Sequence, residues 1–230
     1  MNIRILQGIY GASQAKGLAV VIDVFRAFSV ECYLMEAGAG CILPVGSKET
    51  AYRLKEEHPD YVLVGERHGM ILPGFDFGNS PSQISGAVLT GRTIVHTTSA
   101  GTQGIVAASK GAGEILTGSL VNARAIASYI KKRDPEEVSI ICMGLEAVEE
   151  SPEDTLCGEY IKALLEEREL DMEQGLKAVR EHREGRKFFN PETQHIFPEQ
   201  DFYMSTDLDR FDFVLRVEQV GPDIFRSVRV

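Results

Sequence analysis

The sequence lacks several features that would assign a class at once. Its four cysteines form no CxxC pair and its five histidines show no ligand spacing, so a zinc site is not expected. Three of the cysteines lie among apolar residues, as small core side chains do in a reducing cytosol. No apolar run approaches the 18 or so residues of a membrane span, and no signal peptide is recognisable. We therefore expect a cytoplasmic protein that does not enter a membrane.

Positive charge is also scarce, with 24 Lys and Arg against 34 Asp and Glu and a formal net charge of −10. Proteins that bind a phosphate backbone usually carry a basic excess, so nucleic acid is not an expected partner. An anionic small molecule is not excluded, because arginines, backbone N–H groups and a bound cation can invert the field within one pocket.

Four catalytic or cofactor-binding motifs are missing. There is no GxSxG for an α/β-hydrolase, no GxxxxGK[ST] for a P-loop NTPase and no GxGxxG for a dinucleotide. The paired aspartates of a haloacid-dehalogenase phosphatase are absent from the first apolar run.

The chain of 230 residues contains short apolar runs that alternate with stretches of helical composition. Such alternation is typical of an α/β protein with a largely parallel or mixed sheet covered on both faces. Strands are expected at 18–24, 42–45, 61–64, 93–96, 114–117 and 138–143, and helices at 27–37, 48–57, 104–110, 122–132 and 153–167.

The character of the sequence changes near residue 170. Residues 171–187 are charged with helical spacing, residues 188–210 show little periodicity, and 211–217 suggests a late strand. We expect an α/β core over residues 1–170 and a helical or irregular extension over 171–230 packed on the same body.

Polar and glycine residues gather where five of the expected strands end. Because ligands of open parallel sheets bind at the carboxyl ends of the strands, these residues predict one site. They are Asp23 and Arg26, then Gly65 to Arg67, then Thr97 to Thr102, then Gly118, Ser119 and Asn122, and finally Glu146 to Asp154.

The residue types indicate anion binding together with a hard cation. Arg26 and Arg67 offer planar forks for phosphate or sulfonate oxygens. The turn at 98–102 offers hydroxyl and N–H groups to an oxyanion. Carboxylates of the kind that Mg²⁺ prefers are available as well, at Asp23, Glu66 and Asp76.

Simpler structural roles compete with these interpretations. Asp23 and Ser119 also suit helix N-caps, and the 98–102 turn also suits a helix start. Glu153 and Asp154 also suit the first turn of a helix.

The ordered motifs resemble the 2-phosphosulfolactate phosphatase family. The matching segments span about the first two-thirds of the chain: DVFRA at 23–27, GER at 65–67, GFDFGNSP at 74–81, TSAGT at 98–102, GSLVNA at 118–123, and Glu153-Asp154 with Cys157. The resemblance implies a three-layer α/β/α fold, Mg²⁺ dependence, and hydrolysis of 2-phospho-3-sulfolactate to 3-sulfolactate and phosphate. In organisms that make coenzyme M, this step lies on that pathway.

The sequence departs from the family pattern at two places near the expected site. Phe28 and Ser29 stand where the family usually has two threonines, and Ala100 stands where it usually has asparagine. Two alternatives therefore stay open: a phosphatase for another small phosphorylated hydroxy acid, and a non-catalytic protein that binds an anionic metabolite.

The resulting hypothesis assigns three roles. Asp23, Glu66 and Asp76 hold Mg²⁺, and the catalytic set is Asp23, Glu66, Glu153 and Asp154. The substrate is bound by Arg26, Arg67, Asn79, Ser80, Thr98, Ser99, Gly101, Thr102, Ser119 and Asn122. The residues do not decide between direct attack of water and an aspartyl-phosphate on Asp23. A homodimer is expected only because two-fold assemblies are common.

Overall fold

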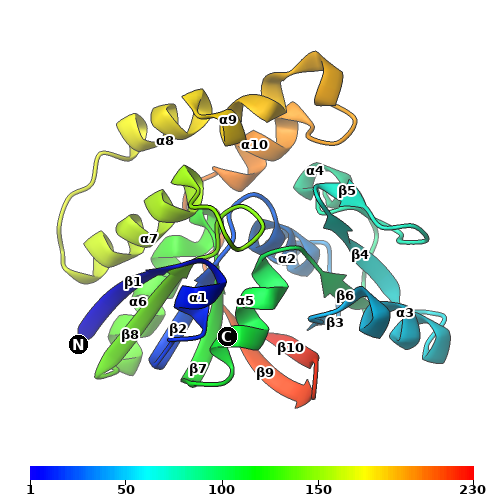
Figure 1. Cartoon of the computed structure of the whole chain (residues 1–230), viewed down its shortest axis with the longest axis horizontal. Coiled ribbons are helices and arrows are strands. Elements are labelled where there is room, and N and C mark those ends of the chain that lie inside the picture. The colour runs from blue at the N-terminus through cyan, green and yellow to red at the C-terminus, as the bar shows by residue number, and fades with distance from the viewer.

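A ten-stranded mixed sheet runs through the whole molecule (Figure 1), and the computed structural model describes all 230 residues. The strand order is β1-β8-β2-β7-β9-β10-β3-β6-β4-β5. The strands are β1 (Asn2–Gln7), β2 (Gly17–Ile22), β3 (Cys41–Pro44), β4 (Val62–Arg67), β5 (Met70–Ile71), β6 (Thr93–Thr97), β7 (Ala112–Gly118), β8 (Glu137–Cys142), β9 (Leu215–Gly221) and β10 (Ile224–Arg229).

The sheet consists of two parallel blocks joined by an antiparallel hairpin. β1, β8, β2 and β7 are parallel to one another, and so are β3, β6 and β4. Between the blocks, β9 pairs antiparallel with β7, and β10 pairs antiparallel with both β9 and β3. The two blocks lie on the left and the right of Figure 1, with the hairpin between them.

Helices cover the sheet. They are α1 (Gly8–Ala12), α2 (Ala27–Glu36), α3 (Lys48–Glu57), α4 (Pro81–Ile84), α5 (Gly101–Ala108), α6 (Ala123–Arg133), α7 (Pro152–Leu165), α8 (Met172–Glu181), α9 (Arg183–Arg186) and α10 (Glu199–Ser205). Short 3₁₀ turns occupy Leu120–Asn122, Lys187–Phe189 and Pro191–Thr193. None of the helices combines the length and apolar character that a bilayer crossing needs.

The central strand β2 shows why its sequence is apolar without interruption. Its side chains alternate between two hydrophobic clusters, with Val21 packed beside α5 residues and Val20 and Ile22 beside α6 and α7 residues. Because successive strand residues face opposite sides, a strand buried on both faces needs apolar residues at every position. The predicted three-layer α/β/α fold with a mixed sheet is confirmed.

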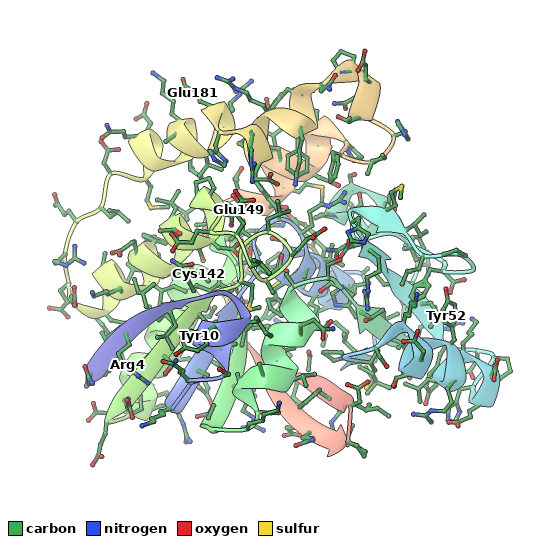
Figure 2. The ribbon with its side chains drawn as sticks, in the orientation of Figure 1. Arg4, Tyr10, Tyr52, Cys142, Glu149 and Glu181 are labelled. Atoms are coloured by element: carbon green, nitrogen blue, oxygen red, sulfur yellow. The ribbon has the colours of Figure 1, made fainter.

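The C-terminal part of the chain contributes both helices and strands. α8, α9 and α10 lie at the top of Figure 1, and Figure 2 shows Glu181 there, in α8. The hairpin β9–β10 lies between β7 and β3, in the middle of the sheet. Residues on both sides of position 170 therefore contribute strands to one sheet.

The chain of pairings makes the two parallel blocks run in opposite senses along the sheet. A sheet twists by about 20–25° per neighbouring pair, which accumulates over the strands that separate β2 from β6. This rotation allows the carboxyl ends of β2, β4, β6 and β8 to contribute to one pocket, described next.

Candidate active site

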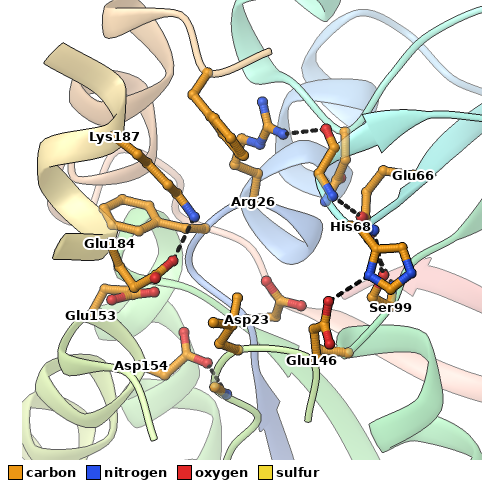
Figure 3. Close-up of a pocket in the computed structure, with 17 residues that line it drawn as sticks. Asp23, Arg26, Glu66, His68, Ser99, Glu146, Glu153, Asp154, Glu184 and Lys187 are labelled. Carbon is orange, nitrogen blue, oxygen red and sulfur yellow. Dashed lines mark hydrogen bonds and ion pairs between the residues drawn. The ribbon is translucent and has the colours of Figure 1, made fainter. Parts of the chain in front are cut away.

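A cavity of about 160 Å³ lies where the loops after β2, β6 and β8 and the end of β4 meet the segment between α9 and α10 (Figure 3). Its size suits a small metabolite, because pockets for drug-sized ligands are usually larger. Acidic residues outnumber basic residues in its lining. Six lining residues are acidic, namely Asp23, Glu66, Glu146, Glu153, Asp154 and Glu184, and the basic ones are Arg26, Lys187 and His68.

Asp23 follows the last residue of β2 and is buried. Its Oδ1 accepts a hydrogen bond from the Ala27 N–H at 3.2 Å, so it does help to begin α2. Its Oδ2 faces Gly101, where a Cβ atom would come within 2.9 Å, so glycine is needed at that position. Burial raises the pKa of Asp23 from 3.8 to about 6; the Ala27 hydrogen bond lowers it, and the nearby charge of Glu66 raises it further.

Asp154 holds the ends of two strands together. Its Oδ1 accepts from the Val24 N–H and its Oδ2 from the Gly144 N–H, both at 2.8 Å. Burial raises its pKa well above the usual value, and the charges of Asp23 and Glu153 raise it further. Because both oxygens already accept backbone hydrogen bonds, Asp154 is better suited to position neighbouring groups than to transfer a proton.

Glu153 lies beside Asp154 in the first turn of α7 and is also buried. Its Oε2 has no hydrogen-bond partner. Burial raises its pKa from 4.5 to about 7, while Lys187 lowers it and Glu184 raises it. A carboxyl with a pKa near the working pH is suited to general acid–base catalysis.

Glu66 joins two loops at the opposite wall. Its Oε1 accepts from the Ser99 N–H at 2.7 Å, and its Oε2 accepts from the Gly69 N–H at 2.7 Å and the Ser99 hydroxyl at 3.2 Å. Each carboxylate oxygen has two lone pairs, so Glu66 retains some capacity for a cation. It therefore fixes the β4–β5 turn against the start of α5 and presents negative charge beside Asp23.

Arg26 lines the pocket, but most of its fork is used within the protein. Nη1 donates to Asp201 Oδ2 at 2.9 Å and to the Ile196 carbonyl at 2.8 Å, and Nη2 donates to the Gly69 carbonyl at 3.3 Å. The ion pair with Asp201 is buried, with side-chain exposures of 4% and 0%. Only part of the Arg26 guanidinium group is therefore free for the predicted binding of an anion.

The structure brings seven of the predicted site residues into the pocket and leaves the others outside its lining. Those inside are Asp23, Arg26, Glu66, Asn79, Ser99, Glu153 and Asp154. Those outside are Arg67, Asp76, Ser80, Thr98, Gly101, Thr102, Ser119 and Asn122.

Asp76 does not lie with the other expected metal ligands. Its Oδ2 accepts from the Leu63 N–H at 2.8 Å and lies 3.7 Å from the Lys55 ammonium. It therefore fixes the loop after β5 against the start of β4, and its assignment to the metal site is not supported.

The other outlying residues have local structural roles. Arg67 donates to the Glu66 carbonyl at 2.6 Å and to the Thr97 hydroxyl at 3.0 Å. The remaining members form caps or hold a neighbouring side chain: Thr98 and Thr102 bond reciprocally, Ser119 and Asn122 form a capping box, and Ser80 donates to Asp201.

Sequence reasoning assigned no role to several residues of the pocket wall. Glu184 and Lys187 come from the charged stretch at 171–187, and Phe197 comes from the stretch at 188–210 with little periodicity; neither stretch contains a motif. Lys187 donates to Glu184 Oε2 at 2.7 Å and lies over the ring of Phe197. Glu146, which belongs to the predicted site segment 146–154, also lines the pocket and forms a 2.6 Å pair with His68 across the exposed rim.

The excess of acidic groups bears on whether a cation fits the pocket. No three of the His, Cys, Asp and Glu side chains are arranged to hold a metal ion by themselves. Mg²⁺ is commonly held by only one or two carboxylates, with the rest of its shell from water and substrate phosphate. Asp23, with Glu66 close enough to raise its pKa, is a donor pair of this kind.

Comparison with known protein families finds a match over nearly the whole chain. A family model described as 2-phosphosulpholactate phosphatase matches residues 5–219. The chain belongs to this family. That membership identifies it as a phosphoric monoester hydrolase.

Relatives of the family cover the chain to different extents. A protein of Bacillus subtilis named probable 2-phosphosulfolactate phosphatase is 32% identical over 231 residues, covering 99% of this chain and 100% of that protein. Proteins of the same name from Deinococcus radiodurans and Thermus thermophilus are 41% and 40% identical over 127 and 129 residues. Those two alignments span 53% and 54% of the relatives' own lengths, and 55% and 56% of this chain.

Proposed function

We propose that this chain hydrolyses the phosphate ester of 2-phospho-3-sulfolactate, releasing 3-sulfolactate and phosphate, and that it requires Mg²⁺. The proposal rests on one observation above all: a small pocket lined by six carboxylic side chains in a protein of a phosphatase family. A strongly anionic substrate would be repelled by such a lining without a cation. Mg²⁺ bound through Asp23 and Glu66 would remove this conflict and neutralise charge on the phosphate.

The other pocket residues have separate roles in the proposal. Asn79 and Lys187 are hydrogen-bond donors for the oxygens of the phosphate and the sulfonate. Glu153, with a pKa raised to about 7, is the candidate proton carrier. Asp154 positions the loop after β2 through its hydrogen bond from the Val24 N–H.

The first chemical step has two possible forms. Water attacks the phosphorus directly, with Glu153 taking its proton, or Asp23 Oδ2 attacks first and water then cleaves the aspartyl-phosphate. Either form ends with one P–O bond broken to the substrate alcohol and one formed from water. Acid quenching during turnover, followed by treatment with hydroxylamine, separates them, because only the second form leaves an acyl phosphate on Asp23 that hydroxylamine converts to a hydroxamate.

Phosphate release is the measurement that tests the function. Racemic 2-phospho-3-sulfolactate is supplied with Mg²⁺ and, separately, with EDTA, beside a panel of other phosphorylated hydroxy acids. We expect rapid release from the sulfonated substrate only with the metal. Asp76→Asn is the matched control for Asp23→Asn, because it makes the same chemical change outside the pocket.

A second candidate substrate class is favoured by one observation. Ala100, which replaces the usual asparagine of the motif, lines the pocket and donates no side-chain hydrogen bond there. Release only from another phosphorylated hydroxy acid would keep the chemistry and assign the change of substrate to this position. Tight binding without any release would instead indicate a protein that only binds an anionic metabolite.

A further inference from the structure

A buried ionisable pair lies behind the pocket and has no part in the proposed function so far. His96 of β6 and Glu31 of α2 are both fully buried. His96 Nδ1 lies 3.0 Å from Glu31 Oε1, and the Ser227 hydroxyl donates to Glu31 Oε2 at 2.9 Å. Charged groups taken out of water are costly unless each is paired and hydrogen-bonded, as these are.

Asn79 lies between the second ring nitrogen of His96 and the pocket. His96 Nε2 lies 3.4 Å from Asn79 Oδ1, and Asn79 lines the pocket. The Asn79 Nδ2 donates no hydrogen bond within the protein, and it is not completely shielded from solvent. The amide NH₂ group is therefore available to a ligand in the pocket.

The direction of the hydrogen bonds follows from the groups involved. An amide oxygen only accepts, so His96 Nε2 donates to Asn79 Oδ1, while Nδ1 lies within hydrogen-bond distance of the Glu31 carboxyl group. The two ends of an asparagine amide have nearly the same shape, so a fixed donor behind the side chain decides which end faces a ligand.

We propose that Glu31 and His96 are positioning residues that turn the Asn79 NH₂ group toward an anionic oxygen of the bound substrate. The proposal rests on the proposed phosphatase function and adds two residues to it. In an acid-rich pocket, an amide oxygen facing the substrate would add to the repulsion, while an N–H donor offsets it. Glu31→Gln replaces the carboxyl group beside His96 Nδ1 with an amide, which disturbs the hydrogen bonds of the ring and weakens its hold on the Asn79 oxygen.

Binding of inorganic phosphate in the presence of Mg²⁺, measured by titration calorimetry, tests this orientation. Asn79→Ala should weaken phosphate binding by roughly 10- to 100-fold, as expected when a hydrogen bond to a charged group is lost. Asn79→Asp should weaken it at least as much, because the new carboxylate repels the anion. Phosphate binding unchanged or tightened by Asn79→Asp would overturn the proposal, since it would place an acceptor and not a donor toward the pocket.

A double-mutant cycle identifies Glu31 as acting through Asn79. Glu31→Gln should weaken phosphate binding by roughly 10-fold alone and by less than about 2-fold in the Asn79→Ala background, because the two changes remove one interaction. Thr117→Val is the control: Thr117 is equally buried, its hydroxyl has no partner and it does not line the pocket. It should leave phosphate affinity unchanged. Additive effects of Glu31→Gln and Asn79→Ala would refute the coupling.

The same titrations distinguish a failure of this proposal from a failure of the proposed function. A wild-type protein that binds phosphate but hydrolyses no ester contradicts the function and leaves the cycle informative. A wild-type protein that binds no phosphate with Mg²⁺ contradicts both. Circular dichroism melting of each variant separates lost affinity from lost folding, and Asn79→Ala at the pocket surface provides a folded variant should Glu31→Gln unfold.

Discussion

Asp23→Asn is expected to make the metal-free protein more stable while it removes activity. The pKa of Asp23 is raised in the folded protein from 3.8 to about 6, so folding favours the protonated form. The stability that this group contributes is therefore complete below pH 3.8 and is lost as the pH rises through about 6. At pH 8 the ionised side chain costs about 3 kcal/mol, at about 1.4 kcal/mol per pKa unit.

Asparagine resembles the protonated acid and keeps the Oδ1 acceptor for the Ala27 N–H. The free energy of unfolding at pH 8 should thus increase by up to about 3 kcal/mol, and by little at pH 4. For a chain of this size that corresponds to about 6–12 °C in the melting temperature. Turnover should decrease by roughly 100-fold or more, because a preorganised charged group is lost.

Urea unfolding in EDTA at pH 8 and pH 4 measures this effect. The chain has no tryptophan, so far-ultraviolet circular dichroism is the suitable signal. Asp76→Asn provides the matched control, since its side chain is 43% exposed and accepts a hydrogen bond that asparagine can still accept. A variant no more stable than wild type at pH 8, or equally stabilised at pH 4, would refute the account of Asp23.

Three further outcomes follow from the pocket. Mg²⁺ should raise the melting temperature of the wild type more at pH 8 than at pH 5, and should have a smaller effect on Asp23→Asn; an equal shift at both pH values would argue against carboxylate binding. Lys187→Met should raise KM for the phosphorylated substrate by roughly 10-fold with a smaller change in kcat, because a cation in the pocket is lost; an unchanged KM would place Lys187 outside the anion site. Asp201→Ala should destabilise by about 3–5 kcal/mol, because it leaves the buried Arg26 unpaired; Asp207→Ala, on an exposed pair with Arg210, should change unfolding by less than about 1 kcal/mol.

Most of the strands could be predicted from the sequence, because a strand buried on both faces of a sheet is apolar at every position. The run at residues 18–24 became β2, and the helix expected at 48–57 is α3 with the same bounds. β1 and β10 were not predicted, because Asn2–Gln7 and Ile224–Arg229 carry polar residues among the apolar ones and lack the continuous apolar run that marks the buried strands. The place of the hairpin in the sheet depends on long-range pairing, which no local pattern encodes.

The site was predictable only where polar residues follow strands. Asp23 and Glu66 were identified in this way and both line the pocket. The same reasoning included Ser119 and Asn122, which form a cap, because a helix start and an anion site use the same residue types. No local pattern indicated Asp201, because its ion-pair partner Arg26 lies 175 positions away in the sequence.

The central position of the β9–β10 hairpin affects how the protein is made. Strands β1 to β8 leave the ribosome before residues 215–229 are synthesised, so β7 and β3 each wait with one unpaired edge. Exposed strand edges are templates for pairing with other chains. A nascent chain of this protein thus depends on the β9–β10 hairpin to cover the edges of β7 and β3. It is most prone to aggregate just before synthesis of the hairpin is complete.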